Sequence, residues 1–322
     1  MAAIFLFVDG VGAGARDPEV NPLARGDFLL SRFEGGEGEA LPRGGRAVLA
    51  DACLGVPGRP QSATGQSAIL SGENAPAALG QHLLGFPNAR LRAWLEPRSI
   101  FRALSGEGRT AAFANAYPVA HLHALGLPAE GEPELPMDIV RRRSRASATT
   151  VAFAAGGGRF RTWGEARKGR ALTHDITGAR ANGYGAGIPP REPEEAAEML
   201  LSIARGHDLT LFEFFETDEA GHARSMERAV EALTRVDRFA RTLVAGLGEG
   251  DSLVVASDHG NVEDLGTRNH TRNPVPVLGF GPAAGLLADI VDLTGIASLL
   301  RVVAGRATPG GLSSRPAHPP GR

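Results

Sequence analysis

The chain has 322 residues, of which 43 are glycine and 22 are proline, a share below the level that signals disorder. Lys and Arg number 34 against 36 Asp and Glu, so the net charge is −2 and no basic excess drives binding to nucleic acid or to an anionic membrane. With 43% apolar residues the chain can bury one large or two modest domains, which excludes a peptide hormone, a zinc-finger module and a coiled coil.

Single occurrences of cysteine and lysine restrict the chemistry further. Cys53 is the only cysteine, which excludes an intrachain disulfide and a thiolate zinc cluster. Lys168 is the only lysine, so phosphate binding would fall mainly to arginine or to metal ions. The N-terminal segment lacks a basic region and Asp9 interrupts its apolar run, which favours a buried strand over a signal peptide. No apolar run approaches the ~18 residues of a membrane span, and we expect a soluble, cytoplasmic protein.

The predicted elements alternate between strands and helices. In chain order they are a strand at 4–8, a helix at 65–70, a helix at 193–205, a strand at 209–215, a helix at 226–243, strands at 253–256 and 275–280, and a helix at 293–303 with Asp292 or Thr294 as its cap. The strand segments are nearly continuous apolar runs, which is typical of strands buried on both faces of a parallel sheet. The fold class predicted is α/β, a mostly parallel sheet with helices on both faces.

The middle of the chain follows a different pattern. Residues 121–190 are rich in glycine and arginine, and their short apolar runs, such as 148–155, fit neither a strand nor a helix clearly. We expect a small inserted cap at 121–189 and a discontinuous core of residues 1–120 and 190–304. Residues 305–322 have almost nothing to bury and are predicted to form a disordered tail.

Acids and histidines follow three of the predicted strands. They are Asp9, Asp218, His222, Asp258 and His259. Because the carboxyl ends of parallel strands meet at one crevice, these side chains should converge, and His270 can fold back to the same edge from the start of the last strand. Oxygen and imidazole donors together suit Mn²⁺, Zn²⁺ or Mg²⁺.

Each of these residues also has an ordinary structural interpretation. A single acid after a strand is more often a helix cap or turn former, and the spacing of Asp218 and His222 describes many surface pairs. The adjacent Asp258 and His259 are harder to explain in this way, because burying both without partners is costly. The metal site is predicted from all six of these acids and histidines taken together, not from any one of them. The remaining histidines are expected to be surface or hydrogen-bonded residues outside it; they include His121, His123, His174 and His207.

Segment 58–72 supplies a hydroxyl nucleophile. Ser62 and Thr64 are predicted to lie in a turn after Pro60, before a helix whose free N–H groups favour a phosphate. A serine bound to a metal would be activated as an alkoxide without a dedicated histidine base. Serine and threonine at this position are also ordinary helix caps.

Five motifs occur in an order typical of one enzyme family. They are FVDG at 7–10, SATGQ at 62–66, DEAGH at 218–222, SDHGNVE at 257–263 and NHTRNPVPVL at 269–278. They resemble the motifs of the alkaline phosphatase superfamily, in particular those of the branch with cofactor-independent phosphoglycerate mutase and phosphopentomutase. The resemblance implies an alkaline phosphatase-like core and a metal-dependent enzyme, a hydrolase or an isomerase. It also implies a phosphoseryl intermediate on Ser62, with Thr64 as the alternative nucleophile.

The resemblance further implies two divalent ions, with Mn²⁺ expected and Zn²⁺ or Mg²⁺ as alternatives. One ion would be held by Asp9, Ser62, Asp258 and His259, and the other by Asp218, His222 and His270. The chain departs from the mutases at Gln66, which stands where they have histidine, so Gln66 is expected near the phosphate. The segment between Ser62 and Asp218 is too short for the transferase domain of the phosphoglycerate mutase. Neither Cys53 nor Ser62 is followed directly by the x-Pro-x-Arg pattern of sulfatases.

Two basic clusters in the predicted cap are expected to select the substrate. The candidates that would hold a phosphate or carboxylate are Arg141, Arg143, Arg145 and Lys168. A solvated helix face is the alternative for most of them. Segments 115–117 and 171–178 are further candidate contacts.

The leading hypothesis is a phosphatase or phosphomutase that acts on a small phosphorylated metabolite, with no nucleic-acid or membrane partner. One alternative is a phosphodiesterase or nucleotide pyrophosphatase of the same fold, which would need a surface on which a base can stack. Another is a non-catalytic, metal-dependent phosphate-binding protein. The sequence makes no prediction about the oligomeric state.

Overall fold

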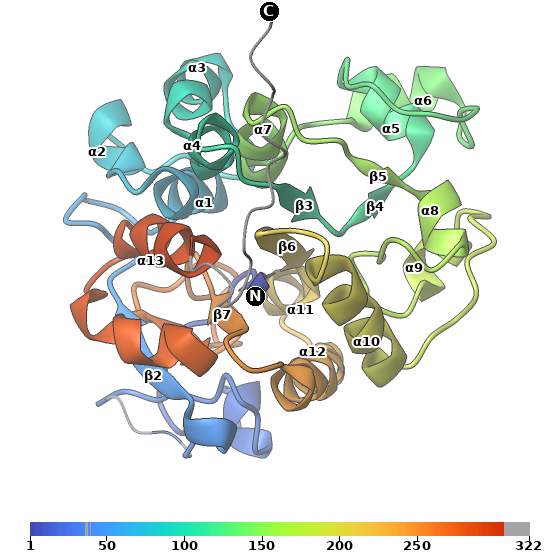
Figure 1. Ribbon diagram of the computed structural model, residues 1–322. Coiled ribbons are helices and arrows are strands. Elements are labelled where there is room, and N and C mark those ends of the chain that lie inside the picture. Colours follow the sequence, from blue (N-terminus) through green and yellow to red (C-terminus); the bar gives the residue numbers. More distant parts are fainter. Residues whose placement is uncertain (36–37, 39, 306–322) are drawn as a thin grey trace, which may run out of the picture.

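A six-stranded sheet forms the centre of the computed structural model, which describes all residues except 36–37, 39 and 306–322 (Figure 1). The strand order is β2-β8-β7-β1-β6-β3. The strands are β1 (Ala3–Val8), β2 (Arg46–Ala50), β3 (Ala111–Phe113), β6 (Leu209–Phe214), β7 (Ser252–Ala256) and β8 (Val275–Phe280). The predicted α/β class with a mostly parallel sheet is confirmed, since β7, β1, β6 and β3 run parallel to one another.

The direction of β8 differs from the prediction. Its residues are buried on both faces as expected, yet it pairs antiparallel with both β7 and β2 and so runs against the other five strands. The physical reason is the connection: no crossover helix lies between β7 and β8, and the chain turns back through the loop 257–274. This reversal places the start of β8, and His270 just before it, at the carboxyl edge of the parallel strands.

Helices cover both faces of the sheet. Along β1, Ala3, Phe5 and Phe7 face one apolar core, and Ile4, Leu6 and Val8 face the other. The first core packs against α1 (Ser62–Ser71), α3 (Ala89–Leu95), α4 (Ile100–Gly106), α7 (Ala148–Ala155) and α13 (Gly295–Ala304). The second packs against α10 (Pro193–Ala204) and α12 (Met226–Gly246), which lie on the opposite side in Figure 1.

The predicted helices at 193–205, 226–243 and 293–303 are confirmed, with small shifts at their ends. In the last, Thr294 occupies the N-cap but makes no side-chain cap; instead Asp292 accepts hydrogen bonds from its backbone N–H and hydroxyl. The first helix begins earlier than predicted, at Ser62, so Ser62 and Thr64 lie in its first turn rather than in a preceding loop. The extended Gln61 precedes this helix, and Gly72, in the left-handed region at φ 74°, ends it.

The middle region divides between the main core and a smaller cluster. The ambiguous run 148–155 is the helix α7, whose Phe153 ring meets the Phe101 ring of α4 edge-on at 5.3 Å. A separate apolar cluster around Trp163 joins the short strands and helices beside it. These elements are β4 (Ala116–Tyr117), β5 (Arg161–Thr162), α8 (Trp163–Arg167) and α9 (Ala179–Asn182). The limits of the cap, 121–189, remain a prediction, and residues 306–322 of the predicted tail lie outside the described part of the chain.

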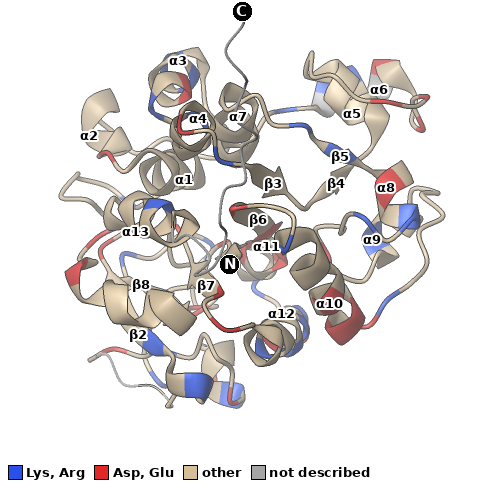
Figure 2. Ribbon diagram, in the orientation of Figure 1, with Lys and Arg blue, Asp and Glu red and all other residues tan. Residues whose placement is uncertain are grey.

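The remaining helices are short. They are α2 (Ala75–Leu79), α5 (Val119–Ala124), α6 (Met137–Arg143), α11 (Glu216–Ala223) and the 3₁₀ segments Pro22–Arg25, Pro42–Gly44, Glu96–Arg98 and Gly281–Asp289. Figure 2 shows acidic and basic residues interspersed over the outer helices, as the near-neutral net charge implies. In the described residues, no helix combines the length and apolar character that crossing a bilayer requires.

Candidate metal centre

The first of two side-chain clusters at the carboxyl edge of the sheet surrounds His259. Asp9 follows β1 directly, and Asp258 and His259 follow β7 after one residue. The Nε2 atom of His259 lies 3.3 Å from Asp9 Oδ1, 3.5 Å from Asp258 Oδ2 and 2.9 Å from the hydroxyl of Ser62. Three segments that are remote in the sequence therefore meet around one imidazole nitrogen.

The second cluster joins α11 to the loop before β8. Asp218 and His222 are four residues apart on α11, which places them on one helix face, with His222 Nε2 3.3 Å from Asp218 Oδ2. His270 Nε2 lies 3.2 Å from His222 Nε2 and 3.6 Å from Asp218 Oδ1. The rings of His259 and His270 are stacked with centroids 3.7 Å apart, so the two clusters adjoin.

The electrostatics of these clusters fit bound cations. Asp258 and His259 are fully buried, and Asp9 Oδ1 and both side-chain oxygens of Asp258 accept no hydrogen bond from the described residues. Burial, reinforced by the neighbouring carboxylates, raises the pKa of Asp9 and of Asp258 well above the usual range. Burial also lowers the pKa of His259 and of His270 to about 4, so both imidazoles are neutral and free to ligate a metal. Divalent cations would satisfy these otherwise costly buried oxygens.

Contacts outside the clusters orient the ligand side chains. His222 Nδ1 lies 3.1 Å from the carbonyl oxygen of Arg268, and His270 Nδ1 lies 3.0 Å from that of Pro60. A hydrogen bond from each Nδ1–H to its carbonyl leaves Nε2 of both rings directed at the cluster. On the other side, Asn261 donates a hydrogen bond of 2.6 Å to Asp218 Oδ1.

Helix α1 packs so closely against the segment of Asp258 that position 65 has room only for glycine. A side chain at Gly65 would come within 2.8 Å of the backbone oxygen of Asp258. Ser62, at the start of this helix, directs its Oγ toward His259. Thr64 is held elsewhere: its hydroxyl lies 3.2 Å from the carbonyl oxygen of Gln61 and accepts a hydrogen bond of 3.2 Å from the backbone of Leu83. Of the two hydroxyls, that of Ser62 therefore contacts the first cluster and that of Thr64 does not.

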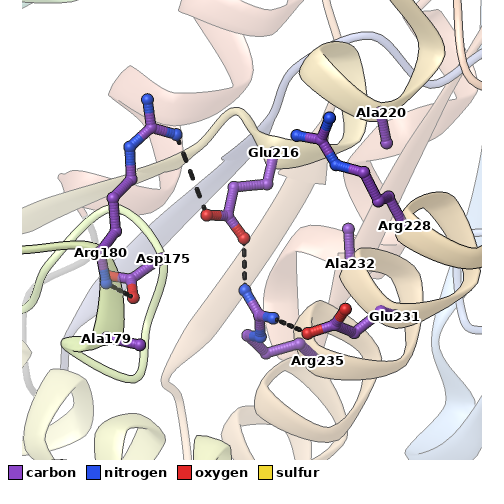
Figure 3. Close-up of a pocket in the computed structure, with 9 residues that line it drawn as sticks. All are labelled: Asp175, Ala179, Arg180, Glu216, Ala220, Arg228, Glu231, Ala232 and Arg235. Atoms are coloured by element: carbon purple, nitrogen blue, oxygen red, sulfur yellow. Dashed lines mark hydrogen bonds and ion pairs between the residues drawn. The ribbon is translucent and has the colours of Figure 1, made fainter. Parts of the chain in front are cut away.

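A charged network ties α11 to its neighbours, as Figure 3 shows. Glu216 lies between Arg235 of α12, with which it forms an ion pair, and Arg180 of α9, whose Nη1 is 4.0 Å from its carboxylate. Arg235 also pairs with Glu231 at 2.6 Å. This network fixes the helix that carries Asp218.

A cavity of about 520 Å³ opens onto both clusters. Among the residues predicted to bind substrate, Gln66 and Arg145 line it. Arg141 and Lys168 are exposed and are not among its lining residues, so their predicted role has no support from the cavity. The side chain of Arg143 lies outside the described part of the chain.

The cavity wall also contains residues that were not predicted from the sequence as site residues. His121 and His174, expected to be surface or hydrogen-bonded residues outside the metal site, both line the cavity. Tyr117 and His174 also fall within the segments 115–117 and 171–178, which are candidate contacts by sequence. Nothing in the local sequence marks the others, because they reach the wall only through the fold; they are Phe86, Arg180, Glu213 and Phe215.

Glu213 is a buried acid on β6 at the cavity wall. Thr149 donates a hydrogen bond of 3.0 Å to its carboxylate, and Asn115 bonds to its backbone on both sides. Burial raises the pKa of Glu213 from 4.5 to about 7, the Thr149 bond opposes this, and the charge of Asp258 adds to it. In metal-free protein above neutral pH, Glu213 thus carries an uncompensated buried charge.

We expect the substitution Glu213→Gln to change how the stability of the metal-free protein depends on pH. A raised pKa means that the folded state holds a proton that the unfolded chain has released, so stability is lost as pH rises from 4.5 to about 7. The shift corresponds to about 3 kcal/mol. Urea unfolding with a chelator at about pH 5 and about pH 8 should show Glu213→Gln gaining that much relative to the wild type at the higher pH. Parallel pH profiles would contradict the assignment.

Comparison with known proteins points to one superfamily. The family model described as Metalloenzyme superfamily matches residues 184–295. The 2,3-bisphosphoglycerate-independent phosphoglycerate mutase of Paracoccus denitrificans is 34% identical over 122 residues, which cover 32% of this chain and 24% of that enzyme. The enzyme of the same name from Halobacterium salinarum is 36% identical over 112 residues, covering 32% and 22%. The aligned part of the chain thus spans about a quarter of the length of these relatives.

The fold resembles that of a solved structure over more of the chain than the sequence matches cover. The crystal structure of the cold-active alkaline phosphatase from the psychrophile Shewanella sp. matches with a TM-score of 0.55 and 14% sequence identity. The match covers 95% of this chain and 100% of that one. At this identity the likeness establishes the fold, and it extends over nearly the whole chain rather than the matched segment 184–295 alone.

Proposed function

We propose that this chain, which belongs to the alkaline phosphatase superfamily and resembles its phosphoglycerate mutase branch, is a metal-dependent phosphatase of small phosphomonoesters that acts through a phosphoserine on Ser62. The observation that carries the proposal is the position of the Ser62 hydroxyl, 2.9 Å from His259 Nε2 and at the N-terminus of α1. A hydroxyl among buried carboxylates and neutral imidazoles has the surroundings that a phosphoryl-transfer nucleophile needs.

The ligand sets are proposed as the sequence motifs imply them. Asp9, Ser62, Asp258 and His259 would hold one divalent ion, and Asp218, His222 and His270 the other. The buried oxygens that lack hydrogen bonds support this assignment, as does the grouping of Asp9, Asp258 and His259. Asp218 and His270 group with His259, which lies between the two sets, and His222 joins them through its contact of 3.3 Å with Asp218. Bound divalent ions, with Mn²⁺ proposed and Zn²⁺ or Mg²⁺ as alternatives, would supply the positive charge that stabilises the transferring phosphoryl group and lowers the pKa of the serine hydroxyl.

The protein's own residues then perform two displacements. Ser62 releases its hydroxyl proton to water and its Oγ attacks phosphorus. The bond from phosphorus to the substrate oxygen breaks, and the leaving alkoxide takes up a proton from water and departs as the alcohol. Water next attacks the phosphoserine, the bond from phosphorus to Ser62 Oγ breaks, and inorganic phosphate is released as Ser62 regains its proton. The free N–H groups at the start of α1, and Gln66 on the cavity wall, can hold the phosphate oxygens during both steps.

Access of water favours hydrolysis over transfer to a second substrate hydroxyl. The side chain of His222 is 45% exposed, so the second cluster borders solvent. The residues 121–189 are proposed as a cap that contributes Arg145 and His174 to the cavity wall without enclosing the site. An acceptor water can reach the phosphoserine from this side.

The test is a metal-dependent activity screen of the full chain. We expect chelated protein to be inactive, and Mn²⁺, Zn²⁺ or Mg²⁺ to restore the release of inorganic phosphate from monoesters by at least about a hundredfold. A nitrophenyl diester turned over faster than the monoester would instead indicate a phosphodiesterase, and isomerisation without phosphate release would indicate a mutase. Negligible turnover with metal bound stoichiometrically would indicate a binding protein.

A further inference from the structure

Four rings form a continuous wall in the cavity, which we call the aromatic ladder: His121, Tyr117, His174 and Phe215. Tyr117 stacks on His121 with centroids 5.5 Å apart and an interplanar angle of 10°, and meets His174 edge-on at 5.0 Å. His174 lies 5.0 Å from Phe215. Phe, Trp and Tyr make up only 6% of the chain, yet Tyr117 and Phe215 lie with two histidine rings at the candidate metal centre.

The ladder is an uncharged surface. Burial lowers the pKa of His121 and brings that of His174 to about 3, so both rings are neutral at physiological pH. The Tyr117 hydroxyl is within 3.5 Å of Thr150 Oγ1, and the guanidinium of Arg180 covers Phe215 at 5.2 Å while pairing with Glu219 at 2.6 Å. The wall thus presents uncharged rings, and the Tyr117 hydroxyl and the Arg180 guanidinium beside them already have partners.

Two exposed apolar side chains line the same cavity, and we call them the apolar lip: Leu84 and Phe86. They are 69% and 49% exposed and flank Gly85, which adopts φ 69° in the loop between α2 and α3. Large apolar side chains side by side on a cavity rim are characteristic of surfaces that a ligand covers. The lip and the ladder therefore give the cavity an apolar part in addition to its metal-binding part.

We infer that the substrate is a phosphomonoester whose alcohol carries a flat ring, with the phosphate at Ser62 and the ring against the aromatic ladder and the apolar lip. This inference rests on the proposed function. A ring and a phosphate together fit within about 520 Å³. The hydroxyls or carboxylate of a sugar or glycerate phosphate placed against the ladder and the lip would find few hydrogen-bond partners there. Stacking on aromatic faces accepts either a nucleobase or a phenyl ring.

Matched substrate pairs test the inference on the metal-loaded full chain. A nucleoside monophosphate is compared with the corresponding ribose phosphate, and phenylethyl phosphate with ethyl phosphate, so that each pair shares its type of leaving alcohol and differs in the ring. We expect kcat/KM to favour the ring-bearing member by about tenfold or more. Preference in one pair alone would support the inference and identify the ring as a base or a phenyl group. Ratios near one in both pairs would overturn it.

Substitution at the lip localises the effect. Phe86→Ala should reduce the ring preference by about tenfold, and Leu84→Ala by a smaller factor, chiefly through KM. Val291→Ala is the matched control, because Val291 is also apolar and 73% exposed but is not among the residues lining the cavity. An unchanged preference in both lip variants, or an equal loss in the control, would overturn the inference.

A binding measurement separates this inference from the proposed function. Adenosine and phenylethanol are titrated into chelated wild type and chelated Phe86→Ala, followed by NMR or calorimetry. We expect wild type to bind at least one of them and Phe86→Ala to bind it about tenfold more weakly. Binding without any metal-dependent turnover would support the ring site and refute the phosphatase. Turnover without ring binding or ring preference would support the phosphatase and refute the ring site.

Discussion

Replacing Ser62 by alanine should lower phosphomonoester turnover by roughly a thousandfold or more, because the covalent intermediate can no longer form. The fold should remain, since Ser62 is the first residue of α1 and its side chain makes no helix cap. Steady-state phosphate release, with circular dichroism as the check on folding, measures the effect. Incubating the wild type with substrate and quenching with acid should trap a phosphoserine that mass spectrometry assigns to residue 62.

The matched control is Thr64→Val, two residues further along the same helix. The Thr64 hydroxyl contacts Gln61 and Leu83 rather than the metal centre, so this variant should keep wild-type turnover within a few-fold while losing some stability. Full activity in Ser62→Ala together with inactivity in Thr64→Val would assign the nucleophile to Thr64.

The substitution Asp258→Asn should remove most of the stability that metal binding gives. Both side-chain oxygens of Asp258 are buried without hydrogen bonds, so a bound cation is the group that would compensate their charge. In the wild type, free metal at about a thousand times its dissociation constant should add about 4 kcal/mol to the free energy of unfolding. Thermal or urea unfolding with and without Mn²⁺ should show this gain in the wild type and little of it in Asp258→Asn, which we also expect to be inactive.

The control for this substitution is Asp289→Asn, which removes the same charge at an exposed position. It should respond to metal as the wild type does. Equal metal-induced stabilisation in Asp258→Asn and the wild type, with equal metal stoichiometry by elemental analysis, would place the cation elsewhere.

The sheet and the two clusters of acids and histidines could be predicted from the sequence because both follow from short patterns. A continuous apolar run predicts a buried strand, and an acid or histidine directly after it falls at the carboxyl edge, whichever strands become neighbours. The direction of β8 could not be predicted in this way, since it depends on the loop 257–274 turning back without a helix. The start of α1 differs from the prediction because serine and threonine are preferred at the N-cap just before a helix, whereas here Gln61 takes that position.

The cavity wall could not be predicted for a different reason. Tyr117, His174 and Phe215 come from three segments without a shared pattern, and an isolated histidine is ordinarily a hydrogen-bonded residue of no special function. Their significance appears only when β4, the loop before α9 and the end of β6 lie side by side. The arginines of the cap were predicted to bind substrate because they are clustered in the sequence. Clustering does not distinguish a solvated helix face from the wall of a binding site. Of the described candidates, Arg145 lines the cavity and Arg141 does not.

The position of Phe215 has a consequence for how such an enzyme can diversify. Phe215 is the residue immediately before α11, the helix that carries Asp218. The aromatic ladder and this helix are therefore connected directly through the backbone. Changes at Phe215 would disturb substrate fit and metal geometry together. Leu84 and Phe86 lie on a separate surface loop that carries no ligand. Substitutions that change the substrate range are therefore expected mainly in that loop. There they can alter the apolar lip without changing the residues around Ser62.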